Sequence, residues 1–216
     1  MTEDAALARA RTEFAALRDT IEGLDDASLD LLFRVARTPN AFDETREVPD
    51  ALLRAAFDIA RMGPTSANSQ PMRIVFVRSA DGKAKLEPSL SEGNRDKTMA
   101  APVTAIIAHD TEFWRDSPRT FIRDLGSTFG DNPAASEVAA FRNGTLGAAY
   151  FLIACRALGL DCGAMSGFDN GVVDDAFFAG TSVKSNFLCN LGWGKPESIM
   201  GPRLYRYEFD EVCRYA

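Results

Sequence analysis

Three short apolar stretches constrain the fold of this 216-residue chain more than any other feature. They span residues 74–77, 103–108 and 185–192, and each is bounded by turn-forming or charged residues. Stretches of this length are typical of strands whose two faces are both covered by other elements. The sequence therefore predicts a buried central sheet, with residues 162–165 as a further short strand.

Segments with a helical spacing of apolar residues lie before and between these strands. We predict helices at residues 4–22, 26–37, 50–62, 81–90, 133–158 and 170–178. The segment 133–158 is rich in Ala and Gly, which predicts that another element packs very closely against it. No repeat, linker or low-complexity region interrupts the chain, and the first helix is typical of a peripheral appendage. We therefore divide the chain into an N-terminal helical extension, residues 1–23, and one domain, residues 24–216.

Charge and cysteine content limit the classes of partner and the cellular compartment. The net charge of −7 and a pI near 4.8 argue against a nucleic-acid groove or an anionic membrane surface as partner. The start of the chain lacks a signal peptide's apolar core, and the longest charge-free apolar stretch, 143–155, is too short to span a bilayer. Cys155, Cys162 and Cys189 lie in apolar surroundings without metal-binding spacing, so we expect buried, reduced thiols in a cytoplasmic protein.

The common catalytic signatures are missing from the sequence. The chain has a single histidine, His109, and neither a G-x-S-x-G elbow nor a phosphate-binding GxxxxGK[ST] loop. The glycines at 144 and 147 fall inside a predicted helix, so they do not form a dinucleotide fingerprint. A lone histidine is more often structural than catalytic. Either this protein is not an enzyme, or a cofactor supplies the chemistry.

Polar residues gather at the ends of predicted elements in five places. These are residues 37–40 (RTPN), 64–71 (PTSANSQP), 93–97 (GNRDK, a predicted polar turn), 165–169 (MSGFD) and Arg203 in the basic, aromatic tail. In this order and spacing the motifs resemble those of the nitroreductase superfamily, from about residue 24 to the C-terminus. Within it, residues 56–78, 141–178 and 184–190 are most similar to the subgroup of malonic semialdehyde reductase (3-hydroxypropanoate dehydrogenase) of bacterial pyrimidine utilisation.

This resemblance implies a fold, a cofactor and an assembly. The expected fold is an FMN-dependent, nitroreductase-like α+β fold with a central mixed β-sheet flanked by helices, in an intertwined homodimer with flavin sites at the interface. NADH or NADPH is the expected electron donor. The subgroup implies reduction of malonic semialdehyde to 3-hydroxypropanoate by ping-pong hydride transfer through flavin N5, and no side chain is needed as a strong acid or base.

The resemblance also implies roles for individual residues. The cations Arg37 and Arg203 suit the FMN phosphate, with Thr38 and Asn40 assisting. Charge develops near flavin N1 on reduction, where Lys97 and Asn94 match. Next to N5, Ser166 offers its backbone N–H, between Met165 and Gly167. The residues expected from the partner subunit are Pro64, Thr65, Ser66 and Asn68.

Alternatives to these roles remain open at the level of sequence. The segment 64–68 and the Ser166–Gly167 pair could be ordinary turns, and Lys97 and Arg203 could be surface residues. Many family members carry a basic residue where this chain has Asn40, so the register of the phosphate motif could shift by one residue.

The substrate also remains open. Arg115, Arg119, Arg123 and Arg142 are candidate partners for a substrate carboxylate, and the sequence does not choose among them. Two other functions compete with malonic semialdehyde reduction: a broad NAD(P)H nitro or quinone reductase with a roomier pocket, and a non-catalytic flavin-binding dimer.

Overall fold

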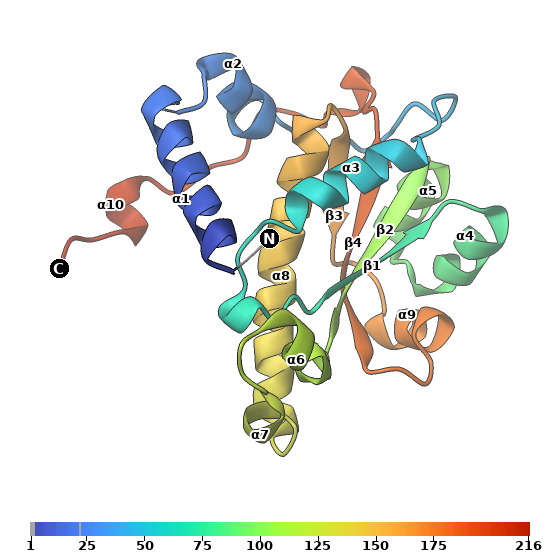
Figure 1. Cartoon of the computed structure of the whole chain (residues 1–216). Helices are drawn as coiled ribbons and strands as arrows, with labels where there is room; N and C mark the ends of the chain where they lie inside the picture. Colours follow the sequence, from blue (N-terminus) through green and yellow to red (C-terminus); the bar gives the residue numbers. More distant parts are fainter. Residues whose placement is uncertain (1–2, 22) are drawn as a thin grey trace.

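A four-stranded antiparallel sheet forms the centre of the domain (Figure 1). The computed structural model describes residues 3–21 and 23–216. The strands are β1 (Met72–Val77), β2 (Val103–Asp110), β3 (Asp161–Met165) and β4 (Val183–Gly192), in the spatial order β1-β2-β4-β3. All three neighbouring pairs are antiparallel. The four predicted strands are therefore present, with β1, β3 and β4 starting one or two residues earlier than predicted.

The prediction of a mixed sheet is wrong for the strand pairs in the described part of the chain. Continuous apolar strands are characteristic of parallel sheets because helices then cover both faces. Here the sheet is antiparallel but is still covered on both faces, so β2 is buried along almost its whole length. The side-chain composition of a strand indicates whether other elements cover its two faces. It does not indicate whether the strand runs parallel or antiparallel to its neighbours.

The helices are distributed over both faces of the sheet (Figure 1). Their bounds are α1 (Glu3–Thr20), α2 (Asp26–Leu29), α3 (Asp50–Ala60), α4 (Ala80–Leu86), α5 (Glu92–Ala100), α6 (Ser117–Thr120), α7 (Gly126–Phe129), α8 (Pro133–Ala157), α9 (Asn170–Phe177) and α10 (Phe209–Val212). Short helical turns are η1 (Asp30–Arg34, a π-helical turn), η2 (Ser66–Asn68), η3 (Glu87–Ser89), η4 (Phe113–Asp116) and η5 (Pro196–Ser198).

Two hydrophobic clusters join these layers. On one face α3 and α8 pack against alternate residues of β2, such as Ala105 and Ile107. On the other face α4 and α9 meet the intervening residues, such as Ile106. Because successive strand residues point to opposite faces, one strand serves both clusters. Full burial of a large side chain such as Phe151 contributes roughly 1.5–3 kcal/mol.

Helix α8 has well-defined ends and a closely packed middle. The side chain of Asn132 caps its start by accepting a hydrogen bond from the Ala135 N–H, and Pro133 occupies the first turn. It ends at Gly159 (φ +81°), and the N–H of Leu160 donates to the Cys155 carbonyl, as in a Schellman motif.

The glycines of α8 explain its close packing. A Cβ on Gly144 would lie 2.8 Å from the His109 Cβ on β2, so only glycine fits without a shift. A Cβ on Gly63, just after α3, would likewise lie 2.6 Å from the Tyr150 ring of α8. The predicted close approach to this helix is therefore confirmed. By length and composition α8 is the one helix of the described residues that could cross a membrane, and here it packs on the sheet as a core helix.

Two predicted elements differ from the structure. The predicted helix 26–37 is shorter, because α2 passes into η1 and the helical region ends at Arg34, so the Arg37–Thr38 motif lies in the following loop. The predicted polar turn 93–97 is wrong, since these residues belong to α5. Their polarity reflects an exposed helix surface. The predicted end of the first helix, Glu22, lies outside the described residues.

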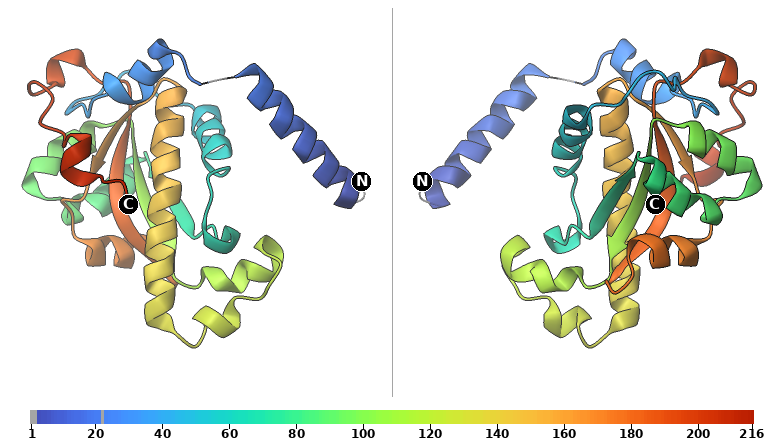
Figure 2. Two further views of the ribbon diagram at one scale, coloured as in Figure 1. Left: turned by 90° about the vertical axis from the view of Figure 1, so that its left-hand side faces the viewer. Right: turned by 90° about the vertical axis from the view of Figure 1, so that its right-hand side faces the viewer.

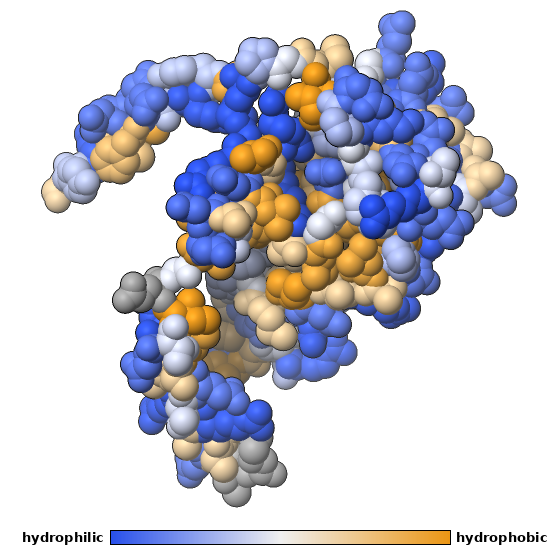
Figure 3. Space-filling model, turned by 90° about the horizontal axis from the view of Figure 1, so that it is seen from above, coloured by the Kyte–Doolittle hydropathy of each residue, from blue (hydrophilic) through white to orange (hydrophobic). Residues whose placement is uncertain are grey.

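The two ends of the chain form separate arms. Figure 2 shows α1 extending away from the domain, and Figure 3 shows α1 and the C-terminal tail as two projections with apolar side chains on the body between them. The tail from Gly201 to Ala216 is exposed throughout.

The cysteines are all free, and three are buried as predicted. Cys155, Cys162 and Cys189 lie in the core, while Cys213 is exposed in the tail. Hydrogen bonding to the Cys162 sulfur, together with burial, raises the pKa of Cys155 and Cys189. These two side chains therefore remain neutral thiols.

Candidate functional site

Four arginines line a cavity of about 330 Å³ where η1, the C-terminal end of α8 and the tail meet. We call this the basic pocket; its arginines are Arg37, Arg156, Arg203 and Arg206, and Thr38 is also part of its lining. The structure therefore brings together two predicted phosphate ligands, Arg37 and Arg203, although they are 166 positions apart in the sequence (203 minus 37).

Hydrogen bonds to backbone carbonyls hold these arginines in place. Arg203 Nη2 donates to the carbonyls of Arg34 and Ala36, each at 2.8 Å. Arg37 Nη2 donates to the Gly201 carbonyl at 2.8 Å, and Arg156 Nη1 to the Leu32 carbonyl at 3.1 Å. The tail is thereby tied to the end of η1.

The charge of the basic pocket has no internal counterion. Among the described residues, none of its four guanidinium groups lies within 4.0 Å of a carboxylate oxygen. Guanidinium groups bind phosphate oxygens through paired, charge-assisted hydrogen bonds. The pocket is therefore chemically suited to a phosphate dianion. This local cluster of basic residues also resolves how a protein of net charge −7 can bind an anion.

Asn40 lies beside the basic pocket and is not part of its lining. Its Nδ2 donates to the Ser198 carbonyl at 3.3 Å, and its backbone N–H donates to the Ser198 hydroxyl at 3.2 Å. These contacts fix the loop before the bridge between Phe42 and Gly194. Asn40 therefore orients the chain that carries Thr38.

A second group of predicted residues meets where α5 approaches the end of β3. Asn94 Nδ2 donates to the Gly167 carbonyl at 2.9 Å, and the Ser91 N–H donates to the same carbonyl at 3.1 Å. A Cβ on Gly167 would lie 2.5 Å from Asn94 Nδ2, so any larger residue would displace the Asn94 side chain from this contact. Lys97 follows Asn94 by three residues, which places both side chains on one face of α5.

The residues around Gly167 complete this second group. Met165 is the last residue of β3, and its sulfur accepts a hydrogen bond from the Thr98 hydroxyl at 3.4 Å. Ser166 follows it and is exposed. Backbone and amide groups thus meet at an exposed turn beside a lysine-bearing helix.

The edge strand β3 separates the two groups. Its first residue, Asp161, accepts a hydrogen bond from the Gly194 N–H at 2.8 Å. Gly194 in turn packs against Pro39, which is next to Thr38. Ser166 follows the other end of the strand. At about 3.3 Å per residue the two ends are roughly 15 Å apart. This arrangement suits an elongated ligand with a phosphate at one end.

The third predicted group, Pro64 to Asn68, lies elsewhere in the molecule. The Ser66 N–H donates to Asn143 Oδ1 on α8 at 2.8 Å, and Asn68 Nδ2 donates to the Thr120 carbonyl of α6 at 2.7 Å. In Figure 1 this stretch runs beside α6 and meets α8 near the middle of the helix, whereas α2 lies near the C-terminal end of α8. A single chain therefore does not bring this segment together with the basic pocket.

Backbone strain is concentrated in the same segment. Ala67, Asn68 and Gln70 have positive φ angles of 52°, 48° and 44°. A left-handed conformation costs a residue with a side chain roughly 1–2 kcal/mol, and such strain tends to cluster at functional sites. Only Asn68 is of a residue type that adopts this conformation readily. The sequence therefore gave little indication of the strain.

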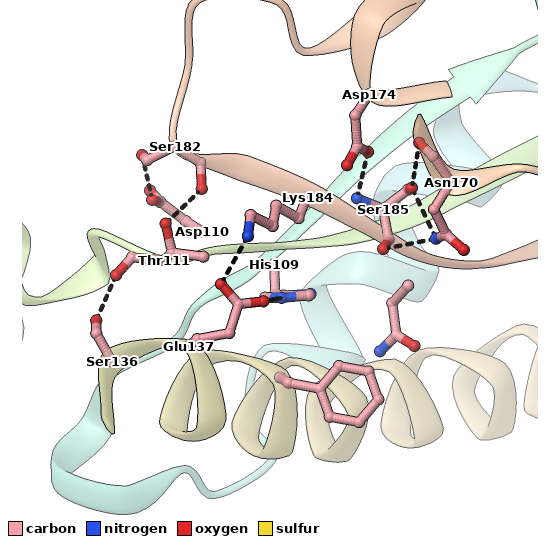
Figure 4. A network of polar contacts seen from close by, with 12 residues as sticks. His109, Asp110, Thr111, Ser136, Glu137, Asn170, Asp174, Ser182, Lys184 and Ser185 are labelled. Carbon is pink, nitrogen blue, oxygen red and sulfur yellow. Dashed lines mark hydrogen bonds and ion pairs between the residues drawn. The ribbon is translucent and has the colours of Figure 1, made fainter. Parts of the chain in front are cut away.

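His109 lies in a polar network between α8 and the sheet (Figure 4). It is almost fully buried, and its Nε2 lies 3.4 Å from Glu137 Oε1. Glu137 Oε2 is in turn 3.0 Å from Lys184 Nζ on β4. Burial raises the pKa of Glu137, but hydrogen bonds from Lys184 and His109 outweigh this and lower it overall. The network ties α8 to β2 and β4, which supports a structural role for the histidine.

Two members of the basic pocket were missed from the sequence. Arg156 was hidden in a predicted apolar helix, although a lone cation near the end of such a helix is a usable signal. Arg206 was noted only as part of the basic tail. Arg156 and Arg206 belong to none of the five predicted motifs. The packing of α8 and the tail places them in the pocket.

Comparisons with known proteins identify the family. The profile of the nitroreductase family matches residues 34–193. A Stenotrophomonas maltophilia protein named as an NADH dehydrogenase/NAD(P)H nitroreductase is 55% identical over 194 residues, covering 89% of this chain and 98% of the relative. A similarly named Xanthomonas oryzae protein is 53% identical over 195 residues, covering 90% and 98%.

Solved structures confirm the predicted nitroreductase-like fold. A Bacillus subtilis nitroreductase superposes with a TM-score of 0.79 at 20% identity, covering 89% of this chain and 100% of that one. An Exiguobacterium sibiricum nitroreductase, solved in complex with FMN, gives 0.76 at 16% identity, covering 91% and 100%. With the profile spanning most of the chain and relatives more than 50% identical along nearly their whole length, this chain belongs to the nitroreductase family.

Proposed function

We propose that this protein is an FMN-dependent NAD(P)H oxidoreductase that works as a homodimer. The observation that carries the proposal is the basic pocket, whose four arginines have no carboxylate partner among the described residues. Family membership and the FMN complex of the Exiguobacterium sibiricum structure support the same cofactor. When bound at this site, FMN would supply the chemistry of hydride transfer between NAD(P)H and an oxidised acceptor.

The residues present fit this cofactor at both ends of β3. Arg37 and Arg203 bind the phosphate with Thr38, and Arg156 and Arg206 add positive charge. At the other end Lys97 and Asn94 stabilise negative charge on the ring, and the exposed Ser166 offers its N–H. Gly167 has no side chain, which lets the cofactor and α5 approach the backbone of this turn closely.

The position of the third group supports the proposed homodimer. Pro64, Thr65, Ser66 and Asn68 are distant from the basic pocket of their own chain, so we assign them to the flavin of the partner subunit. Exposed apolar side chains on α8, among them Phe141 and Leu146, provide a surface that a second copy covers. In this proposal one chain supplies the basic pocket of its own flavin site and the segment 64–68 of its partner's flavin site. Neither flavin site is complete without both chains.

The proposed substrate is malonic semialdehyde, reduced to 3-hydroxypropanoate. This assignment rests on the resemblance of the motifs to that subgroup. A broader NAD(P)H nitro or quinone reductase is the second candidate, and the nitroreductase names of the relatives favour it. Comparing kcat/KM for malonic semialdehyde with that for a nitroaromatic acceptor separates the two. A protein that binds FMN but oxidises no NAD(P)H with either acceptor is the non-catalytic flavin-binding alternative.

The test of cofactor binding is a visible spectrum of the purified protein, followed by anaerobic titration with NADH and NADPH. We expect two flavin absorption bands that bleach on addition of the reduced nucleotide. In Arg203→Gln the affinity for FMN should fall about 10- to 100-fold, since a hydrogen bond to a charged group contributes roughly 1.5–3 kcal/mol.

The control for this variant is Arg9→Gln, which changes an arginine of α1 that is paired with Glu13. Its FMN affinity should equal that of the wild type. Thermal unfolding without FMN shows whether Arg203→Gln still folds. A colourless wild-type protein that cannot be reconstituted with FMN would contradict the proposed function.

A further inference from the structure

A second cavity contains a cation that the flavin does not use. This cavity, which we call the Arg119 pocket, has a volume of about 430 Å³ and lies between α3, α6, α8 and the segment 63–73. Its polar lining includes Arg61, Arg73, Arg119, Thr65, Ser69 and Gln70. Its size is within the usual range for small-molecule sites.

Ion pairs distinguish the arginines of this region from one another. Arg73 Nη2 lies 2.7 Å from Asp110 Oδ2 and 3.8 Å from Asp116 Oδ2, and Arg61 Nε lies 3.1 Å from Asp58 Oδ1. Both charges are therefore compensated within the protein. Arg119 has no carboxylate within 4.0 Å in the described part of the chain. The lining also holds one carboxylate, Asp116, which lies on the Arg73 side of the pocket, 3.8 Å from Arg73 Nη2. Arg119 is thus the one lining arginine without an ion pair among the described residues.

A buried hydroxyl in the same pocket also lacks a partner. Ser69 is only 5% exposed, and its Oγ is buried without a hydrogen-bond partner among the described residues. A buried polar group left unpaired costs roughly 1–3 kcal/mol. An oxygen atom of a ligand in this pocket supplies the missing partner. The cation and the hydroxyl thus point to a ligand with anionic oxygens.

We propose that the Arg119 pocket binds the carboxylate of the reducible substrate, with Arg119 as its cationic partner. The inference rests on the proposed function, because Thr65 belongs both to this pocket and to the segment assigned to the partner's flavin. The pocket is then carried to the edge of that flavin together with the segment. It selects small monocarboxylate acceptors over neutral ones.

The structure also separates Arg119 from the other arginines nearby. Arg115 Nη2 lies 2.9 Å from Glu112 Oε1 and its guanidinium packs over the Trp114 ring. Arg142 lines a different, shallow hollow with Val138 and Phe141. Neither these two arginines nor the fourth candidate, Arg123, lines the Arg119 pocket. Arg119 is therefore the specificity residue, and Arg115 provides a matched control on the same short stretch of chain.

The experiment compares two acceptors of similar size and shape, the anionic 4-nitrobenzoate and the neutral 4-nitrobenzamide. In Arg119→Gln we expect KM for 4-nitrobenzoate to rise about 10- to 100-fold, the effect of losing one charge-assisted hydrogen bond. The value of kcat for this acceptor and KM for the amide should change little. Arg119→Lys should recover part of the affinity, and Arg115→Gln should match the wild type for both acceptors.

A binding measurement tests the same pocket without turnover. Calorimetric titration of the full-length protein with benzoate should give a weaker Kd in Arg119→Gln than in the wild type, while benzamide binding stays equal. Benzoate binding that is identical in both proteins would overturn the proposal. A rise in KM for NADPH alone, with unchanged 4-nitrobenzoate kinetics, would also overturn it, because it assigns Arg119 to the donor's phosphate.

These experiments distinguish a failure of the carboxylate pocket from a failure of the proposed function. Benzoate binding that depends on Arg119, in a protein that oxidises no NAD(P)H, supports the carboxylate pocket and contradicts only the oxidoreductase activity. Arg119-dependent binding together with an active enzyme supports both.

Discussion

Two glycines of α8 differ in what faces them, and this difference gives a residue-scale prediction. In Gly144→Ala the new methyl group lies 2.8 Å from the His109 Cβ, an atom fixed to the backbone of β2. We expect destabilisation of roughly 1–3 kcal/mol from this overpacking, offset in part by the higher helix propensity of alanine.

The control is Gly147→Ala on the same helix. Its methyl group meets the flexible Met72 side chain at 3.4 Å, an ordinary contact. This variant should be neutral or more stable by up to about 1 kcal/mol. Urea unfolding of both variants measures the difference. Equal stabilities would show that α8 can move away from β2 at little cost.

Individual residues also show how far the sequence could predict the site. Arg37, Thr38 and Arg203 were predicted from motifs, and the structure places all three in one pocket. The sequence did not choose among the arginines of the middle region, because the choice depends on which of them an acidic neighbour already compensates. Glu112 compensates Arg115 from only three residues away, whereas the cavity beside Arg119 forms only in the tertiary structure.

At the scale of elements, the contact between α8 and β4 predicts a pH dependence of stability. The pKa of Glu137 is lowered in the folded protein by Lys184 and His109, against the opposing effect of burial. A carboxylate with a depressed folded pKa stabilises the fold above its unfolded pKa of 4.5, and this contribution is lost as the pH falls through the folded value.

The Lys184→Met variant should show a smaller loss of stability on acidification. The comparison is the free energy of unfolding at neutral pH and at roughly pH 3, where carboxylates become protonated. The exposed pair of Arg9 and Glu13 provides the control, since Arg9→Gln should leave the pH profile unchanged. A Lys184→Met profile that superposes on that of the wild type would contradict the assigned coupling.

Element prediction succeeded where one periodicity dominated. The apolar strands and α8 were placed within two residues. The segment of α5 failed because Gly93, Asn94 and Asp96 resemble a turn when neighbouring packing is ignored. The direction of the strands could not be obtained either, because an antiparallel strand covered on both faces has the same composition as a parallel one.

At the scale of the whole molecule, we expect the C-terminal tail to hold the proposed dimer together. Every residue from Gly201 to Ala216 is exposed in the single chain, including the large apolar side chains Leu204, Tyr205 and Tyr207. Apolar surface of this kind is usually covered by a partner. Deletion of residues 204–216 should therefore shift the protein from dimer to monomer in sedimentation velocity experiments.

The matched deletion removes residues 1–21 at the other end of the chain. We place these residues in a peripheral extension, so their loss should leave the dimer intact. Both deletions retain Arg203, and circular dichroism is the check that each variant remains folded. A dimer that survives the C-terminal deletion, or dissociates only after the N-terminal one, would reverse the roles of the two arms.

The placement of the cysteines has a consequence for how the protein responds to electrophiles. Thiolates are the nucleophilic form of cysteine, so an electrophile reacts fastest with thiols that are accessible and can deprotonate. Cys155 and Cys189 are sealed in the core as neutral thiols, whereas Cys213 alone among the four is exposed, on the tail. A reactive electrophile is therefore expected to modify the tail first and to leave the packing of the core intact.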